Sequence, residues 1–309
     1  MPRGPDVPRL VLGTIAHHHM RSSLKVLLCA AALAGGAVAP ACSRNQSDKS
    51  PAVATPSLSL SKDRVPIGSA VTLTYKFQVA PDASFDRNYY VFVHVLDPEG
   101  EQMWTDDHLP PTPTGQWKAG QTIEYKRTIF VPNYPYIGPA DVRLGMYDPA
   151  TNRRLALNAQ EVSRREYLVT RFQVQPQSEN VFLIYKDGWH QPESDAKNPS
   201  VEWQWTKKTA TINFRNPRKD ATLYLEFDAR TDLFNPPQQV TLSLGGQSIA
   251  QFAADAKNPT LKTFPMTAAQ MGNGDMVDLT IAVDRTFSPG NNDPRELGIR
   301  VFHAYVEPK

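Results

Sequence analysis

Short apolar runs with a period of two are the feature that most constrains the fold of this chain. In the segment 71–79 every second residue is apolar, which is typical of a half-buried β-strand. The segment 89–96 is almost continuously apolar, as expected of a central sandwich strand. The chain has 27 prolines, which disfavour long helices, and no long helical period is present. We therefore expect an all-β fold.

Two groups of such runs predict two sandwich domains. About six or seven runs lie within 57–176, separated by turn sequences such as Asp97–Gly100, and predict an immunoglobulin-like sandwich. About eight more lie within 180–309 and predict a jelly roll. In that second segment, Gly245-Gly246 predicts a hairpin turn and Thr267–Met271 a single helical turn.

The first 41 residues have the pattern of an export signal. Met20–Lys25 is short and basic, and Val26–Ala39 is apolar and rich in small residues, but too short to span a membrane comfortably. The 19 residues before Met20 are unlike a signal start, so we expect translation to begin at Met20.

Cys42 follows this signal directly and is the expected lipidation site. The segment Ala39-Pro40-Ala41-Cys42 resembles a bacterial lipobox, although Ala39 replaces the usual branched aliphatic residue. The alternative is ordinary cleavage after Ala41. The chain has two cysteines, and Cys29 lies within the signal, so an internal disulfide is not expected and lipidation explains Cys42 best.

The segment 42–56 is polar and contains prolines, so we expect a flexible tether rather than part of a core. Ser43 after the cysteine resembles the pattern of lipoproteins sorted to the outer membrane. The remaining chain after residue 41 has 29 basic and 30 acidic residues, a net charge of −1. Nucleic acid is therefore not an expected partner, whereas the membrane is, through the lipid.

Three segments of the first predicted sandwich, Tyr90–Gly100, Pro111–Gly120 and Leu144–Pro149, carry a resemblance that spans about residues 70–157. They resemble soluble β-sandwich regions of bacterial membrane glycosyltransferases and related envelope proteins. The resemblance implies a fold but not transferase chemistry, because the membrane-embedded catalytic part of such enzymes is missing. In the second segment, 240–247 and 297–301 resemble galactose-binding-like and carbohydrate-binding jelly rolls.

The five tryptophans are the candidate ligand-binding residues. Trp203 and Trp205 lie two apart, so in a strand both rings face the same side and offer flat surfaces to a sugar. The alternative is that both fill a core or a domain seam. The other three, which lie in loop-like contexts and are either ligand platforms or loop anchors, are Trp104, Trp117 and Trp189.

No catalytic, metal or cofactor site is predicted. Asp106-Asp107-His108 has no further ligands at a recognisable spacing, and Asp293–Glu296 is expected to be a charged turn. His94 lies in an apolar strand and is expected to be structural. The chain has no nucleophile elbow, phosphate loop or zinc-protease motif.

We therefore expect a non-catalytic, exported envelope lipoprotein, anchored in a membrane that is expected to be the outer one and facing the periplasm or the cell surface. Its expected role is binding a glycan or a cell-envelope polymer. The alternatives are a protein-interaction or scaffold module of an envelope or export assembly, and an unrecognised carbohydrate-active enzyme. The sequence leaves the ligand, the protein partners and the oligomeric state open.

Overall fold

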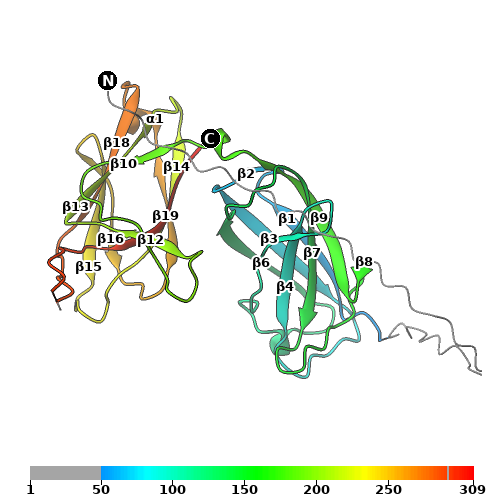
Figure 1. Cartoon of the computed structure of the whole chain (residues 1–309). Coiled ribbons are helices and arrows are strands. Elements are labelled where there is room, and N and C mark those ends of the chain that lie inside the picture. The colour runs from blue at the N-terminus through cyan, green and yellow to red at the C-terminus, as the bar shows by residue number, and fades with distance from the viewer. Residues whose placement is uncertain (1–49, 291) are drawn as a thin grey trace, which may run out of the picture. The chain divides into compact units, whose positions relative to one another are not determined.

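The computed structural model describes residues 50–290 and 292–309. The predicted export signal, Cys42 and most of the predicted tether lie outside these residues. In the described part, strands dominate, so the prediction of an all-β chain is confirmed (Figure 1). None of the helices in this part is long and apolar enough to cross a membrane.

The first half of the described chain forms a sandwich of a three-stranded and a six-stranded sheet. The three-stranded sheet has the order β1-β3-β6, and the larger one has the order β2-β9-β7-β4-β5, with β8 paired to β9. Its strands are β1 (Ala54–Leu60), β2 (Arg64–Pro66), β3 (Ala70–Val79), β4 (Tyr90–Leu96), β5 (Gln102–Thr105), β6 (Thr122–Phe130), β7 (Gly138–Tyr147), β8 (Gln160–Ser163) and β9 (Glu166–Gln175). All pairs are antiparallel except β2 with β9.

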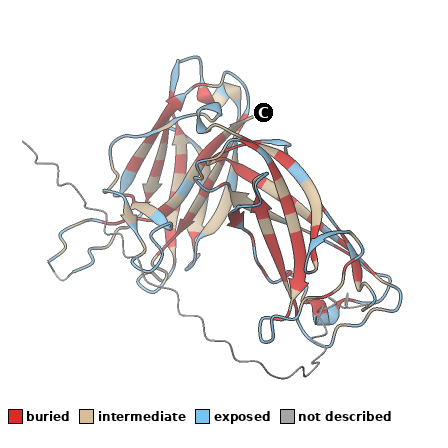
Figure 2. Ribbon diagram, turned by 45° about the vertical axis from the view of Figure 1, so that its right-hand side comes forward, coloured by how far each residue is buried: buried red, intermediate tan, exposed pale blue. Residues whose placement is uncertain are grey.

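The core of this sandwich combines alternate residues of both sheets. The apolar face of β3 that alternation predicted, including Tyr75 and Phe77, is buried against Val91 and Val93 of β4 and Leu144 of β7. Figure 2 shows the resulting striping of buried and accessible residues along the strands. The period-two pattern thus corresponds directly to one buried face per strand.

The second half forms a sandwich of two five-stranded sheets, ordered β10-β13-β18-β15-β16 and β11-β12-β19-β14-β17. Its strands are β10 (Leu183–Tyr185), β11 (Glu193–Ser194), β12 (Glu202–Trp205), β13 (Thr209–Arg215), β14 (Ala221–Asp228), β15 (Gln238–Leu244), β16 (Gln247–Ala254), β17 (Thr260–Met266), β18 (Met276–Val283) and β19 (Arg300–Pro308). From β13 onward the chain passes repeatedly between the sheets, as in a jelly roll. A separate core, which includes Phe214, Leu225 and Leu242, lies between them.

Two local predictions in this sandwich are confirmed. Gly245 and Gly246 join β15 to β16 with φ values of 54° and 84°, a left-handed backbone that glycine adopts without strain. Thr267 caps the one-turn helix α1 (Ala268–Met271), and its hydroxyl and the side chain of Gln270 satisfy each other's backbone N–H groups. Two short 3-10 helices, η1 (Thr114–Gln116) and η2 (Gln177–Glu179), complete the described elements.

Strand β4 is a central strand, as expected, and lies between β7 and β5 in the larger sheet. Val91, Val93 and Val95 belong to the core, whereas Phe92 and His94 lie outside it on the opposite face of the sheet. Phe92 is nevertheless only 2 % exposed, because other side chains cover it there. The apolar run therefore contains an outward-facing part that sequence periodicity did not separate from the core.

Candidate ligand-binding sites

Three of the five candidate tryptophans have enclosed rings. Trp104 and Trp117 belong to the first core, where Trp104 packs near Phe172 and the indole N–H of Trp117 donates to the Thr112 carbonyl over 2.8 Å. Trp205 is also buried and meets Phe287 edge-on at 5.6 Å. The structure therefore places these rings as packing residues, because neither face is open to a ligand.

Trp189 is half-buried and acts as a loop anchor. Its indole N–H donates to the Thr211 carbonyl over 2.9 Å, and its ring packs beside Tyr185 with centroids 4.7 Å apart. The ring also borders the second core. Both contacts tie the 185–193 segment to the sandwich, which is the anchoring role weighed for this residue.

Trp203 is the candidate that lies at an accessible groove. This groove, here called the Trp203 platform, has a volume of about 140 Å³ and is lined by Tyr185, Pro192, Glu202, Trp203, Gln204, Val301 and Phe302. The rings of Trp203 and Phe302 lie on the neighbouring strands β12 and β19, with centroids 5.9 Å apart. The platform thus combines aromatic rings with a carboxylate and an amide from the same strand.

Arg300 braces this platform from within β19. Its guanidinium lies 4.8 Å from the Trp203 ring centroid, 4.9 Å from that of Phe302 and 5.6 Å from that of Trp205. The same guanidinium donates two hydrogen bonds to the carboxylate of Asp228, which is 2 % exposed. A planar cation that both stacks on rings and pairs bidentately fixes the rotamers around it.

The three residues weighed as a metal cluster have separate roles. Asp106 is buried and accepts from the Tyr75 hydroxyl (2.7 Å) and from two nitrogens of Arg127. His108 is buried beside it, and Asp107 is exposed and accepts the Val93 backbone N–H. Within the described residues, no group of three or more potential ligands is close enough to hold a metal ion.

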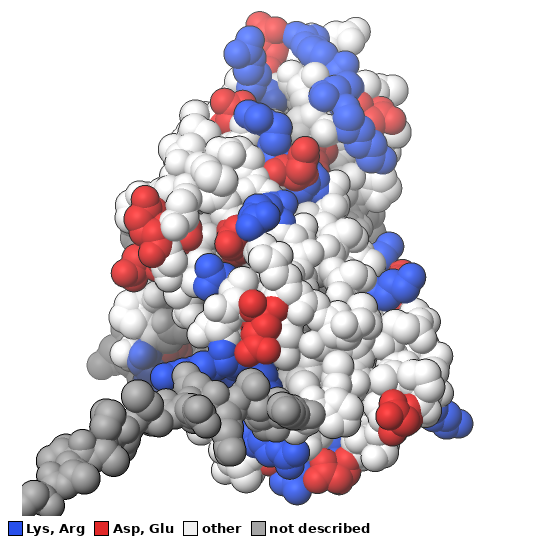
Figure 3. All heavy atoms as spheres, turned by 90° about the vertical axis from the view of Figure 1, so that its right-hand side faces the viewer, with Lys and Arg blue, Asp and Glu red and all other residues white. Residues whose placement is uncertain are grey.

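The charged segment Asp293–Glu296 before the last strand is held by ion pairs. Arg295 donates to both carboxylate oxygens of Asp293 and also to Glu193 of β11. On the face of the molecule that Figure 3 shows, basic and acidic side chains are interspersed in the same way. Because basic and acidic side chains alternate on that face, it has no large patch of a single charge sign.

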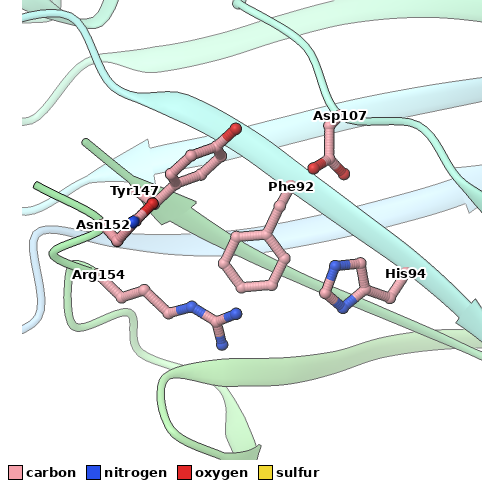
Figure 4. A pocket seen from close by; sticks show the side chains of 6 residues that line it. All are labelled: Phe92, His94, Asp107, Tyr147, Asn152 and Arg154. Atoms are coloured by element: carbon pink, nitrogen blue, oxygen red, sulfur yellow. The ribbon is translucent and has the colours of Figure 1, made fainter. Parts of the chain in front are cut away.

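A pocket that the sequence analysis did not predict lies on the outer face of β4 and β7. This β4–β7 pocket, of about 310 Å³, is lined by Phe92, His94, Asp107, Tyr147, Asn152 and Arg154. Figure 4 shows the Phe92 ring at its centre, with the other five side chains around it. The Arg154 guanidinium lies over that ring, 4.3 Å from its centroid.

Glycine at position 145 makes this pocket possible. Gly145 lies opposite Phe92 in the β4–β7 register, and a Cβ there would approach the Phe92 ring to 2.3 Å and the Arg165 carbonyl oxygen to 2.6 Å. A glycine within a strand marks such a close approach, so this residue was the available sequence signal. A second signal was the period-two series Tyr90, Phe92 and His94 within the apolar run.

An acidic residue of β9 holds two of the pocket's basic groups. His94 Nδ1–H donates to Glu166 Oε1 over 3.2 Å, and Arg154 lies 3.8 Å from the other carboxylate oxygen. Burial, followed by the negative charge of Asp107, raises the pKa of the Tyr147 hydroxyl above its ordinary value of 10. The pocket therefore carries oriented donors and acceptors around one aromatic ring.

Comparison with known proteins adds little to this description. No protein-family model and no curated protein sequence matches the chain. A β-glucuronidase of Bacteroides uniformis aligns with a TM-score of 0.28 and 10 % identity over 82 % of this chain and 30 % of its own. A structure titled pT26-6p aligns with a TM-score of 0.26 and 9 % identity over 84 % of this chain and 63 % of its own. This chain therefore spans less than a third of the length of the β-glucuronidase.

Proposed function

We propose that the protein is a non-catalytic, exported envelope lipoprotein that binds a glycan polymer at the Trp203 platform. The observation that carries this proposal is the half-buried Trp203 ring, which lines a groove beside Phe302 and is braced by Arg300. Aromatic faces suit the C–H face of a pyranose ring, and rigid strands hold such a face without a large entropic cost on binding. Glu202 and Gln204 also line the groove, and the Gln204 amide is held by its hydrogen bond to the His190 carbonyl over 3.1 Å.

The shape of the platform favours a polymer over a small isolated sugar. A groove of about 140 Å³ is smaller than the roughly 300 Å³ at which ligand pockets begin, so it contacts one side of a sugar ring and leaves the chain free to continue. Binding by a shallow groove gains affinity when several units of one polymer bind several protein molecules on the same membrane. A lipid anchor at Cys42 would provide that arrangement.

The experiment is retention of the full chain on envelope polysaccharide, measured by affinity electrophoresis. We expect Trp203→Ala to abolish retention and Trp203→Phe to retain part of it, because phenylalanine keeps a smaller aromatic face. Phe302→Ala is expected to weaken retention. Circular dichroism of each variant shows whether the fold is preserved. Folded Trp203→Ala protein that is retained like the wild type would exclude this site.

The anchor is tested separately, by intact mass and membrane fractionation beside Cys42→Ser. We expect wild-type protein to carry diacylglycerol and to sediment with membranes, and the variant to be released. Unmodified, soluble wild-type protein would instead support ordinary cleavage after Ala41 and a freely diffusing protein.

A second candidate function, that of a protein-interaction module, is favoured by one observation. The edge strand β10 and the residue before it carry apolar side chains with large exposed fractions, 77 % for Phe182 and 42 % for Ile184. Crosslinking in cells that yields one dominant protein partner, together with no retention on glycan, would favour this function. Turnover of envelope glycans that a single acidic substitution abolishes would favour an enzyme.

A further inference from the structure

We infer that the β4–β7 pocket is a second binding site, which takes one uncharged sugar unit through neighbouring hydroxyl groups. The inference rests on residues of the first sandwich and is independent of the Trp203 platform. Its volume of about 310 Å³ lies at the lower end of the roughly 300–1,000 Å³ range of small-molecule pockets. That size suits a single ring rather than a chain.

The pocket's hydrogen-bonding groups are oriented but not saturated. Asp107 Oδ1 accepts the Val93 N–H, and His94 Nδ1 is occupied by Glu166, which fixes both side chains. Asp107 Oδ2, His94 Nε2 and the Tyr147 hydroxyl have no hydrogen-bond partner among the described residues. Acceptors and donors that converge on one space match vicinal hydroxyls, because each hydroxyl both donates and accepts.

Aromatic rings close the floor of the pocket, but the Phe92 ring is only 2 % exposed, so the partly exposed Tyr147 ring is the apolar surface that a ligand can reach. The Phe92 ring lies at the centre of the pocket in Figure 4, and the Tyr147 ring lies 6.1 Å from it. Arg154 covers part of the Phe92 ring and is itself held by the Arg164 carbonyl at 3.2 Å. A sugar ring has an apolar face and a rim of hydroxyl groups. Its apolar face therefore matches the Tyr147 ring, and its hydroxyls match the polar side chains of the pocket.

The charges select against acidic sugars. Arg154 is matched by Glu166, which lies 3.8 Å away, and Asp107 adds a further negative charge. Asp107 has no ion-pair partner among the described residues, so it would repel a carboxylate or phosphate on the ligand. An uncharged hexose is the ligand class that fits.

The experiment titrates the full chain with single sugars and follows saturation-transfer NMR and calorimetry. The panel consists of methyl glucoside, methyl galactoside, methyl mannoside, N-acetylglucosamine and glucuronic acid. We expect at least one uncharged sugar to bind, and glucuronic acid to bind at least about tenfold more weakly than methyl glucoside, because its carboxylate meets Asp107. No binding by any uncharged sugar, or tighter binding of glucuronic acid, overturns the inference.

Two conservative variants test the residues themselves. Tyr147→Phe removes one hydroxyl, and Asp107→Asn keeps an acceptor for the Val93 N–H but removes the charge. Each is expected to weaken the uncharged sugar about tenfold, as for a lost hydrogen bond to a charged or buried partner. Arg153→Gln is the matched control, because Arg153 is exposed, adjoins the pocket residues in sequence and does not line the pocket. Unchanged affinity in both variants overturns the inference.

The two sites are distinguished by their variants. Trp203→Ala is expected to leave single-sugar binding unchanged, and Tyr147→Phe to leave polymer retention at the Trp203 platform measurable. Polymer retention without any single-sugar binding would overturn this inference and leave the proposed function standing. Loss of single-sugar binding in Trp203→Ala would show that the sugar occupies the platform instead, and would also overturn the inference.

Discussion

The polar network inside the first sandwich shows how single residues set the properties of its core. Asp106 is buried and is satisfied by Tyr75 and Arg127, so its charge is paired and hydrogen-bonded. His108 Nδ1–H donates to the Asp106 carbonyl at 2.6 Å, and His108 Nε2 accepts from the Tyr125 hydroxyl at 2.8 Å. The carbonyl acceptor places a proton on Nδ1, and the neutral imidazole accepts from the Tyr125 hydroxyl through Nε2.

A pH dependence of stability follows from His108. Burial, the largest cause, lowers the pKa of His108 below its ordinary value of 6.5, and Arg127 lowers it further, although the Asp106 carbonyl and charge oppose this. Below pH 6.5 the unfolded state therefore binds a proton that the folded state does not. The free energy of unfolding is expected to fall as the pH drops through this range, by at most about 1.4 kcal/mol per pH unit.

Urea unfolding of the wild type at pH 7.5, 6.5 and 5.5 measures this effect. His108→Gln, which keeps a donor and an acceptor, is expected to flatten the dependence. His190→Gln is the control, because His190 lies in the other sandwich and its imidazole has a hydrogen bond only to the Glu296 carbonyl among the described residues. An equally steep dependence in His108→Gln would assign the effect to other groups.

Gly145 is a second single residue whose replacement is expected to affect both stability and the β4–β7 pocket. A Cβ at this position meets the Phe92 ring and the Arg165 carbonyl well inside van der Waals contact, and backbone atoms yield less readily than side chains. We expect Gly145→Ala to lower the free energy of unfolding by about 1–3 kcal/mol, as overpacking does, and to weaken single-sugar binding. Urea unfolding and calorimetry check both effects; an unchanged free energy of unfolding would mean that Phe92 moves freely.

At the scale of elements, β19 links the second core to the Trp203 platform. Its residue Val301 points into the core, whereas Arg300 and Phe302 on either side of it point outward. Strand β14 pairs with β19 and supplies Asp228, and β12 pairs with its other side and supplies Trp203. Three strands thus position one cluster of rings around one guanidinium.

Replacing that guanidinium by an ammonium tests this role. Arg300→Lys keeps the charge but loses the bidentate pair with Asp228 and the planar contacts with the rings. We expect the free energy of unfolding to fall by about 1–2 kcal/mol, and polymer retention to weaken several-fold. Urea unfolding measures the free energy of unfolding, and affinity electrophoresis measures polymer retention. Arg127→Lys, which alters the bidentate pair with Asp106 in the first sandwich, serves as the control and is expected to retain polymer normally.

At the scale of the whole molecule, the described residues contain two separate hydrophobic cores. Leu144 is fully buried in the first and Leu225 in the second, and no residue is shared between them. Leu144→Ala and Leu225→Ala are therefore a matched pair. Each is expected to cost about 2–5 kcal/mol in its own sandwich and to leave the other largely unaffected.

Hydrogen exchange followed by mass spectrometry of peptides resolves the two sandwiches separately. In Leu144→Ala we expect faster exchange in peptides of β3, β4 and β7, and in Leu225→Ala in peptides of β13, β14 and β19. Faster exchange throughout the chain in either variant would mean that both sandwiches unfold as one cooperative unit.

Local sequence patterns determined the strand content of this protein. Side chains on a strand alternate between faces, so the apolar positions of 71–79 specify a strand and its buried face without reference to any partner. The Gly245-Gly246 hairpin and the Thr267 cap are equally local, because they depend on backbone conformation and on residues at most three apart.

Only the tertiary structure decided which aromatic rings are accessible. The sequence does not separate buried from accessible tryptophans, because burial depends on what the opposing strands and loops bring over each ring. Trp104 and Trp117 thus lie in a core, whereas Trp203 lies at a groove. The β4–β7 pocket could not be predicted for the same reason. Its side chains come from 92 to 154, over strands and loops whose proximity is a result of sheet pairing rather than of any spacing in the sequence.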